Sequence, residues 1–275
     1  MKYFNQTLAY LFKYGKGKRF FIFFLLMLPS CAIFAYFFPL SRHFTFFFDY
    51  LRTSYYSWGR LWLDFDHSAI SLSLSFVGAV ITVFAVAYVA TVITRHVRVG
   101  EFGFPKLLYS VNEGFFPALS VTIALMALIL VTHTVYTIFL YMWMRLANKI
   151  FGLILSLITF LGLSVAVVYL ISSLILWLPI MFYNGLFAFK AMGVAFYKSR
   201  TYQRFFFLPN LMHLGILYVV ALGAHFTRSV WFVEWILNAL AYTYFAVVTL
   251  AFSVISYCET ESITREDLAK NYFGR

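Results

Sequence analysis

The stretch FGLILSLITFLGLSVAVVYLISSLILWLPI, residues 151–180, decides the fold of this chain. It contains no charged side chain from its first residue to its last. A helix rises about 1.5 Å per residue and the hydrocarbon core of a bilayer is about 30 Å thick, so roughly 20 apolar residues are enough to cross it. The stretch therefore predicts a transmembrane helix.

Five other stretches have the same character, and Glu234 is the only charged residue within any of the six. The predicted spans are Phe20–Phe38, Ala69–Ile93, Ala118–Phe139, Phe151–Ile180, Leu208–Phe226 and Val230–Ser256. Apolar residues make up 63% of the 275-residue sequence and charged residues 11%, against about 45–50% and 25% in soluble domains. This composition excludes a soluble domain, and the lack of alternation within the runs excludes a β-barrel. We expect an all-α polytopic membrane protein whose residues 1–275 form one membrane domain.

The basic residues between the spans predict how the chain is oriented. Fifteen Lys and Arg residues lie in the N-terminal segment, the second and fourth connections and the C-terminal tail, against six in the remaining connections. Basic residues concentrate on the cytoplasmic side of a membrane. Both termini, including the tail over residues 257–275, are therefore expected in the cytoplasm. Topology also explains the net charge of +11, so nucleic acid is not expected as a partner.

The second and fourth connections share a plan in which a basic, partly apolar segment precedes a proline. Residues 104–114 are expected to form a short helix in the membrane interface that stops at Gly114, with Pro117 opening the third span. Residues 184–204 take the same place before Pro209 and the fifth span. Two units of span, interfacial elbow helix and proline-led span predict a weak parallel repeat.

Aromatic and small residues suggest how the helices are arranged. The outer segment over residues 41–68 is rich in aromatic rings, which favour the headgroup layer, so interfacial helix is expected there. Small residues on two helices are expected to let neighbouring helices approach closely. They are Ser71, Ser73, Ser75 and Gly78 on one helix, and Gly152, Ser156, Gly162 and Ala166 on the other. Cys31 and Cys258 lie near opposite sides of the bilayer, so no disulfide is expected.

Three segments carry a resemblance to known proteins: residues 95–114, residues 178–204, and the exit over residues 256–259 followed by Leu268. In these segments the chain resembles a loose group of bacterial six-span membrane proteins. The group includes the membrane region of glycerophosphoryl diester phosphodiesterases and the YciC-like proteins, and the YesL-like proteins are a second possibility. The resemblance implies the architecture and a place in the bacterial cytoplasmic membrane. It does not carry over catalysis, because the phosphodiesterases add a soluble catalytic barrel for which this sequence has no counterpart.

The sequence also lacks the common catalytic motifs. Residues 15–18, GKGK, do not have the spacing of a phosphate-binding loop, and no His-Glu-x-x-His, Cys-x-x-Cys or Gly-x-Ser-x-Gly occurs. We therefore expect no enzymatic activity, no cofactor and no metal site.

Four polar residues within the spans are candidates for an intramembrane site. Glu234 and Asn238 are four residues apart and share one helical face. His133 lies in the outer half of the third span and His213 in the inner half of the fifth, where imidazoles could relay protons. The structural alternative is that Glu234 pairs at the outer interface with Arg228 or the aromatic segment, and that each histidine bonds a neighbouring helix.

Six basic residues of the second and fourth connections are candidates for contacts to anionic lipid headgroups. They are Arg95, Arg98, Lys190, Lys198, Arg200 and Arg204. The alternative is that they only set topology.

Three functions remain open from the sequence. The leading hypothesis is a non-enzymatic accessory or scaffold protein associated with membrane lipids or the envelope, with anionic lipids and membrane proteins as partners. The second is a small-solute transporter or permease component that uses the four polar residues of the spans. The third is a subunit of a larger membrane complex.

Overall fold

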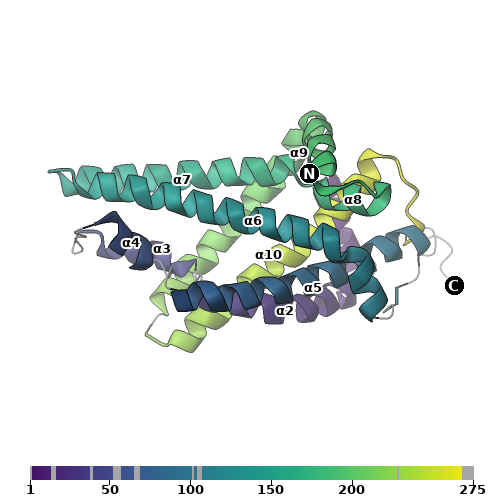
Figure 1. Cartoon of the computed structure of the whole chain (residues 1–275), viewed down its shortest axis with the longest axis horizontal. Coiled ribbons are helices and arrows are strands. Elements are labelled where there is room, and N and C mark those ends of the chain that lie inside the picture. Colours follow the sequence, from purple (N-terminus) through teal and green to yellow (C-terminus); the bar gives the residue numbers. More distant parts are fainter. Residues whose placement is uncertain are drawn as a thin grey trace.

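The structure is a computed structural model of the chain, and it describes residues 2–13, 17–37, 40–51, 57–64, 69–100, 102–103, 107–227 and 229–267. Regular structure in these ranges is entirely helical (Figure 1). The elements are α1 (Lys2–Leu8), the π-helix η1 (Ala9–Lys13), α2 (Lys18–Phe37), α3 (Ser41–Asp49), α4 (Trp58–Asp64), α5 (Ala69–Val99), α6 (Leu107–Met144), α7 (Lys149–Ser173), α8 (Trp177–Asn184), α9 (Ala188–Phe226) and α10 (Trp231–Thr260).

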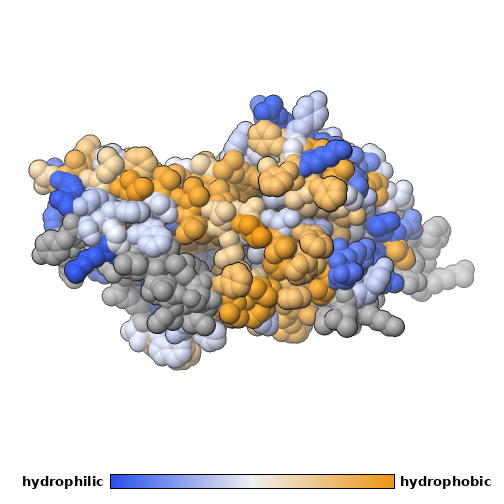
Figure 2. Space-filling view, viewed as in Figure 1, coloured by the Kyte–Doolittle hydropathy of each residue, from blue (hydrophilic) through white to orange (hydrophobic). Residues whose placement is uncertain are grey.

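Within the described ranges, six helical segments are long and apolar enough to cross a membrane. They are α2, α5, α6, α7 together with α8, α9, and α10. Figure 2 shows an apolar middle of the molecule with hydrophilic side chains gathered toward both ends of the long axis. The predicted all-α polytopic fold is confirmed.

The centre of the bundle is formed by α2, α5 and α10, which lie together in Figure 1. Long runs of α5 and α10 are buried, over residues 86–94 and 251–258. The α6–α7 pair runs along one flank and exposes apolar side chains such as Ile129 and Ile158. Such exposure suits contact with lipid rather than water.

The N-terminal segment forms α1 and η1, which the sequence analysis did not predict. The ring of Phe4 packs edge-on against His213 of α9 and Phe252 of α10, with centroids 5.0 and 6.0 Å apart. The Tyr10 hydroxyl lies 3.1 Å from Nδ1 of His96, near the end of α5. The start of the chain and the ends of α5 and α10 therefore meet at one end of the bundle, which we call the basic end because Arg95, Arg98 and Arg265 lie there.

The prediction that Gly114 stops an elbow helix is wrong, because α6 continues through both Gly114 and Pro117. The glycine serves packing instead: a Cβ at position 114 would lie 2.7 Å from the Ala87 carbonyl oxygen and 2.8 Å from Oγ1 of Thr91. Helix α9 likewise runs through Pro209. Prolines are tolerated inside membrane helices because neighbouring helices and local adjustments satisfy the freed backbone groups.

One predicted span is interrupted just before Pro179, which has no N–H to donate to the Ile175 carbonyl oxygen four residues earlier. The predicted helix over residues 151–180 divides into α7 and α8, with a turn over residues 174–176. The hydroxyl of Ser253, on α10, donates to the Ile175 carbonyl oxygen at 2.6 Å. The indole nitrogen of Trp177 donates to the Ala188 carbonyl oxygen at 2.8 Å and so ties α8 to the start of α9.

The outer segment is helical in its described parts, α3 and α4, and it packs on the bundle. The indole nitrogens of Trp58 and Trp62 donate to the side chains of Thr137 and Thr134, at 3.2 and 3.3 Å. Phe46, Tyr50 and Leu61 are buried in a cluster with Tyr136, Leu140 and Phe160. These aromatic residues therefore fill space between helices.

The small residues fulfil their predicted role at some positions only. A Cβ at Gly78 would meet Ile33 of α2 at 2.8 Å, and one at Gly152 would meet the Trp143 carbonyl oxygen at 2.5 Å. Gly162 has open space around it, and Ala166 is exposed. The side chains of the three predicted serines of α5 lie outside the described residues. Both cysteines are free and buried.

Candidate functional site: a pocket at the basic end

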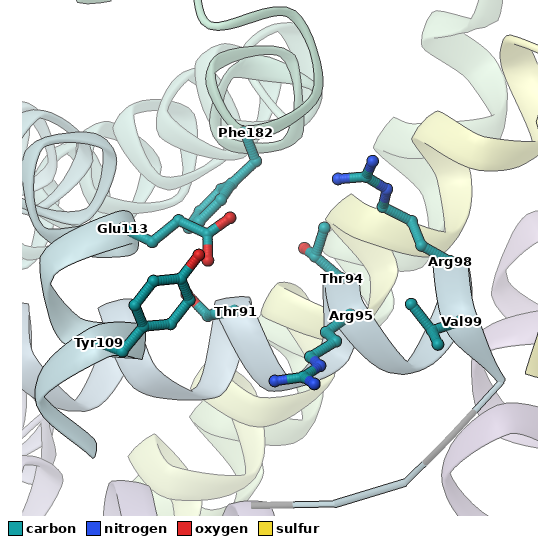
Figure 3. Close-up of a pocket in the computed structure, with 8 residues that line it drawn as sticks. All are labelled: Thr91, Thr94, Arg95, Arg98, Val99, Tyr109, Glu113 and Phe182. Carbon is teal, nitrogen blue, oxygen red and sulfur yellow. The ribbon is translucent and has the colours of Figure 1, made fainter. Parts of the chain in front are cut away.

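A pocket of about 420 Å³ opens at the basic end, between the last turns of α5, the first turns of α6 and the end of α8 (Figure 3). Its lining residues are Thr91, Thr94, Arg95, Arg98, Val99, Tyr109, Glu113 and Phe182. A volume of this size lies at the lower end of the range typical for small-molecule sites.

The α5 wall is polar and basic. Thr91, Thr94, Arg95 and Arg98 follow the i, i+3, i+4, i+7 spacing that places residues on one helical face. Thr94 is only 7% exposed, and its buried hydroxyl has no hydrogen-bond partner among the described residues. The guanidinium carbon of Arg98 stands 5.6 Å from the ring centre of Tyr183, on α8. In Figure 3 the Arg98 guanidinium points toward the Phe182 side of the pocket, the Arg95 guanidinium points the opposite way, and the Thr94 hydroxyl lies between them.

The α6 wall is formed by Tyr109 and Glu113, which are four residues apart and share a face. Figure 3 shows the Glu113 carboxylate and the Tyr109 ring close together, with the Phe182 ring pointing toward them from α8. The close approach at Gly114 holds this part of α6 against Thr91 of α5. The glycine therefore sets the width of the pocket.

The pocket lies at the level where the membrane spans end. The apolar part of α5 runs to Val99, that of α6 begins at Val111, and that of α7 and α8 ends at Asn184. The ends of membrane-spanning helices generally lie near the boundary between hydrocarbon and headgroups.

Two of the charged residues that line the pocket have no ion-pair partner among the described residues. Neither Arg95 nor Glu113 forms an ion pair within the part of the chain that the structure describes. Elsewhere at the basic end the charges are paired: Arg265 contacts Asp267 at 3.0 Å and Glu259 at 3.4 Å, with the Arg265 and Asp267 side chains 4% and 0% exposed. Burial lowers the pKa of Arg265, but its bonds to Asp267 and Glu259 outweigh this effect and raise the pKa overall.

The other four basic candidates lie on α9, outside the pocket lining. Lys198 pairs with Glu261 at 2.6 Å. The guanidinium of Arg200 stacks over the ring of Phe196, 4.9 Å from its centre. Lys190 and Arg204 are exposed. The structure therefore separates the six predicted basic residues into a pocket pair and a basic surface on α9.

Glu234 and Asn238 lie together as predicted, and a third residue joins them. The hydroxyl of Ser41, at the start of α3, donates to Oε1 of Glu234 at 2.5 Å, and the Asn238 amide donates to the same hydroxyl at 3.1 Å. The Asn238 amide also bonds the Glu234 carbonyl oxygen at 2.8 Å. A residue of the aromatic segment therefore binds Glu234, as the structural alternative expected, while Arg228 lies outside the described residues.

The two histidines lie in separate surroundings. The His133 ring packs edge-on against His43, with centroids 5.3 Å apart, near Tyr136. His213 is 1% exposed among the rings of Phe4, Tyr244 and Phe245, and neither of its nitrogens has a hydrogen-bond partner among the described residues. The histidines and the Glu234–Asn238 pair therefore have different neighbours. A metal ion has no group of three or more suitable side chains in the described ranges.

Tyr109, Glu113 and Phe182 were not predicted as site residues. A signal was present in the sequence, because the TxxTRxxR spacing over residues 91–98 and the Tyr–Glu spacing over residues 109–113 each place polar groups on one helical face. The sequence did not show that these faces of α5 and α6 lie opposite each other.

Comparisons with known proteins identify no family for this chain. No protein-family model matches it, and no curated protein or solved structure is significantly similar to it. The resemblance to the six-span group stays a prediction.

Proposed function

We propose that this integral membrane protein binds the phosphate-bearing headgroup of a membrane lipid in the pocket at its basic end. In this role it acts as a non-enzymatic, lipid-associated accessory protein of the bacterial cytoplasmic membrane, with the basic end facing the cytoplasm. The observation that carries the proposal is the position of Arg95 and Arg98 in a pocket at the ends of helices that are long and apolar enough to cross a membrane.

The chemistry of the α5 wall supports this function. A guanidinium group matches the geometry of phosphate oxygens and can donate two parallel hydrogen bonds to them. Basic residues near a membrane surface contribute about 1 kcal/mol each to the binding of anionic lipid. The buried hydroxyl of Thr94 offers a further hydrogen bond to a phosphate.

The transporter hypothesis has less support in the geometry. It requires Glu234, Asn238, His133 and His213 to line a shared route, whereas Glu234 and Asn238 bond Ser41 and the histidines pack in two other places. The exposed apolar side chains of α6 and α7 suit lipid and a partner subunit equally, so they do not favour membership of a larger complex.

The test compares two pairs of arginines at the same end of the molecule. The double variant Arg95→Gln and Arg98→Gln should retain at least about tenfold less phospholipid than the wild-type protein, because two headgroup contacts are lost. The retained lipid is measured by native mass spectrometry of protein purified in mild detergent. The matched control is Arg200→Gln with Arg204→Gln, which removes the same charge from the surface of α9. Equal retention by both double variants would show that a diffuse basic belt holds lipid, and the proposal would fail.

A further inference from the structure

We infer that the pocket selects a headgroup that carries both a phosphate and a primary ammonium, as in phosphatidylethanolamine. This inference rests on the proposed function and names its ligand. It is carried by the arrangement of the lining, in which Arg95 and Arg98 stand on α5 and Glu113 stands across the pocket on α6 (Figure 3).

The lining carries charges of both signs on different walls. A guanidinium group of α5 suits a phosphate, whereas the Glu113 carboxylate of α6 would repel one. Glu113 has no cationic partner among the described residues. An anionic headgroup without a cation, such as that of phosphatidylglycerol, would leave this carboxylate uncompensated. A headgroup with an ammonium beyond its phosphate would place a cation there.

The rings around Glu113 add to the match. Tyr109 and Phe182 lie beside the carboxylate in Figure 3, and aromatic faces attract cations. A primary ammonium has three N–H donors for a carboxylate and a tyrosine hydroxyl, whereas the quaternary ammonium of choline has none. The pocket should therefore prefer ethanolamine to choline headgroups.

The buried hydroxyl of Thr94 is an independent sign that the pocket receives a polar ligand. Thr94 lines the pocket, is more than nine-tenths buried, and its hydroxyl oxygen bonds no described residue. Buried polar atoms are nearly always hydrogen-bonded. In Figure 3 this oxygen points into the space between the two walls, where a headgroup phosphate would lie.

The same chemistry occurs in a membrane lipid and in soluble glycerophosphoethanolamine. The position of the pocket at the ends of the spans favours the lipid, as does the apolar, half-exposed Val99 in its lining.

The experiment offers the full-length, delipidated protein an equimolar mixture of phosphatidylethanolamine, phosphatidylglycerol and phosphatidylcholine with identical acyl chains. Native mass spectrometry gives the ratio of bound lipids. The wild-type protein should bind the ethanolamine lipid several-fold more than either of the others. Glu113→Gln should lower the ethanolamine-to-glycerol ratio about tenfold, while Glu261→Gln, an acid at the same end that pairs with Lys198, should leave it unchanged.

Each outcome separates this inference from the proposed function. If the paired Arg95→Gln and Arg98→Gln changes abolish lipid binding but Glu113→Gln leaves the ratio unchanged, the headgroup inference is overturned and the proposed function stands. If none of these changes affects binding, both fail. Displacement of the lipid by equimolar glycerophosphoethanolamine would overturn a lipid as the occupant, whereas resistance to displacement supports it. Unchanged thermal unfolding midpoints for the variants will show that they are folded.

Discussion

The pocket at the basic end and the Ser41–Glu234–Asn238 cluster place polar side chains inside the same bundle in opposite ways. In the cluster, a single hydroxyl bonds both the carboxylate and the amide, and the amide bonds a backbone oxygen as well. In the pocket, Arg95 and Glu113 form no ion pair with any described residue, and the Thr94 hydroxyl bonds none. We call the first arrangement closed, because its polar side chains bond one another, and the second open, because these pocket groups do not bond one another.

The difference shows how to distinguish structural from binding groups in a membrane protein. Polar groups that satisfy one another hold helices together, because leaving them unpaired in hydrocarbon is costly. Polar groups that face a cavity contribute little to folding and remain available to a ligand. Closed clusters should therefore lose stability when altered, and open ones should lose binding.

The largest expected loss of stability is at the most buried closed cluster, Arg265–Asp267. Asp267→Asn removes the stronger partner of a guanidinium that is 4% exposed. Breaking a buried ion pair costs about 3–5 kcal/mol, so the thermal unfolding midpoint in detergent should fall strongly. The exposed Lys198–Glu261 pair is the control, because Glu261→Gln should cost less than about 1 kcal/mol. Similar losses in the two variants would contradict the distinction.

The next effect tests how the pocket is held open. Gly114→Ala places a Cβ against the Ala87 carbonyl oxygen and the Thr91 hydroxyl, and overpacking of this kind costs about 1–3 kcal/mol. Both the unfolding midpoint and the retained phospholipid should decrease, since α6 must move away from α5. Gly162→Ala is the control: its surroundings are open, so stability should be unchanged or slightly raised. A Gly114→Ala protein that matched this control would refute the close approach.

A narrower effect, on stability alone, is expected at the closed cluster of the opposite end. Ser41→Ala removes the hydroxyl shared by Glu234 and Asn238. A buried polar group that loses its hydrogen-bond partner lowers the free energy of unfolding by about 1–3 kcal/mol. The unfolding midpoint should fall while lipid retention stays the same. Ser120→Ala serves as the control, because that hydroxyl bonds only the Phe116 carbonyl oxygen of its own helix. Loss of lipid together with stability would mean that the cluster is not purely structural.

The smallest change in stability should come from the open pocket. Thr94→Val replaces a buried hydroxyl that has no described partner by a methyl group, so the free energy of unfolding should stay the same or rise, because no hydrogen bond to a described residue is lost. Phospholipid retention should nevertheless fall about threefold to tenfold, the effect of losing one hydrogen bond worth about 1 kcal/mol. Thr201→Val, at an exposed position on α9, should alter neither quantity. An unchanged retention would remove Thr94 from the binding site.

The membrane spans could be predicted from the sequence because charge-free apolar runs are a local property. The proximity of Glu234 and Asn238 was predictable for the same reason, since four residues make one helical turn. The predicted ends were less accurate: α5 reaches Val99 rather than Ile93, and α9 begins at Ala188 rather than Leu208. A hydropathy pattern stops at the first charges, whereas backbone hydrogen bonding continues through the headgroup layer.

The features that escaped prediction depend on contacts between distant segments. At the break after Ser173, the hydroxyl of Ser253 donates to the Ile175 carbonyl oxygen, and these two residues are 78 positions apart in sequence. Gly114 has the local signature of a helix stop, but Ala87 and Thr91 of α5 determine its role. The pocket likewise requires α5, α6 and α8 to converge, so Arg95 and Arg98 could be predicted as basic residues but not paired with Glu113.

The length of α6 has a consequence for the pocket. Its 38 residues extend roughly 57 Å at 1.5 Å per residue, nearly twice the thickness of about 30 Å of the hydrocarbon core. The helix must therefore lean, or project from the bilayer, and its inclination must follow any thinning or thickening of the surrounding lipid. Tyr109 and Glu113 belong to the first turns of α6, so the position of this wall of the pocket depends on the inclination of the helix. The thickness of the whole bilayer therefore affects the shape of the pocket.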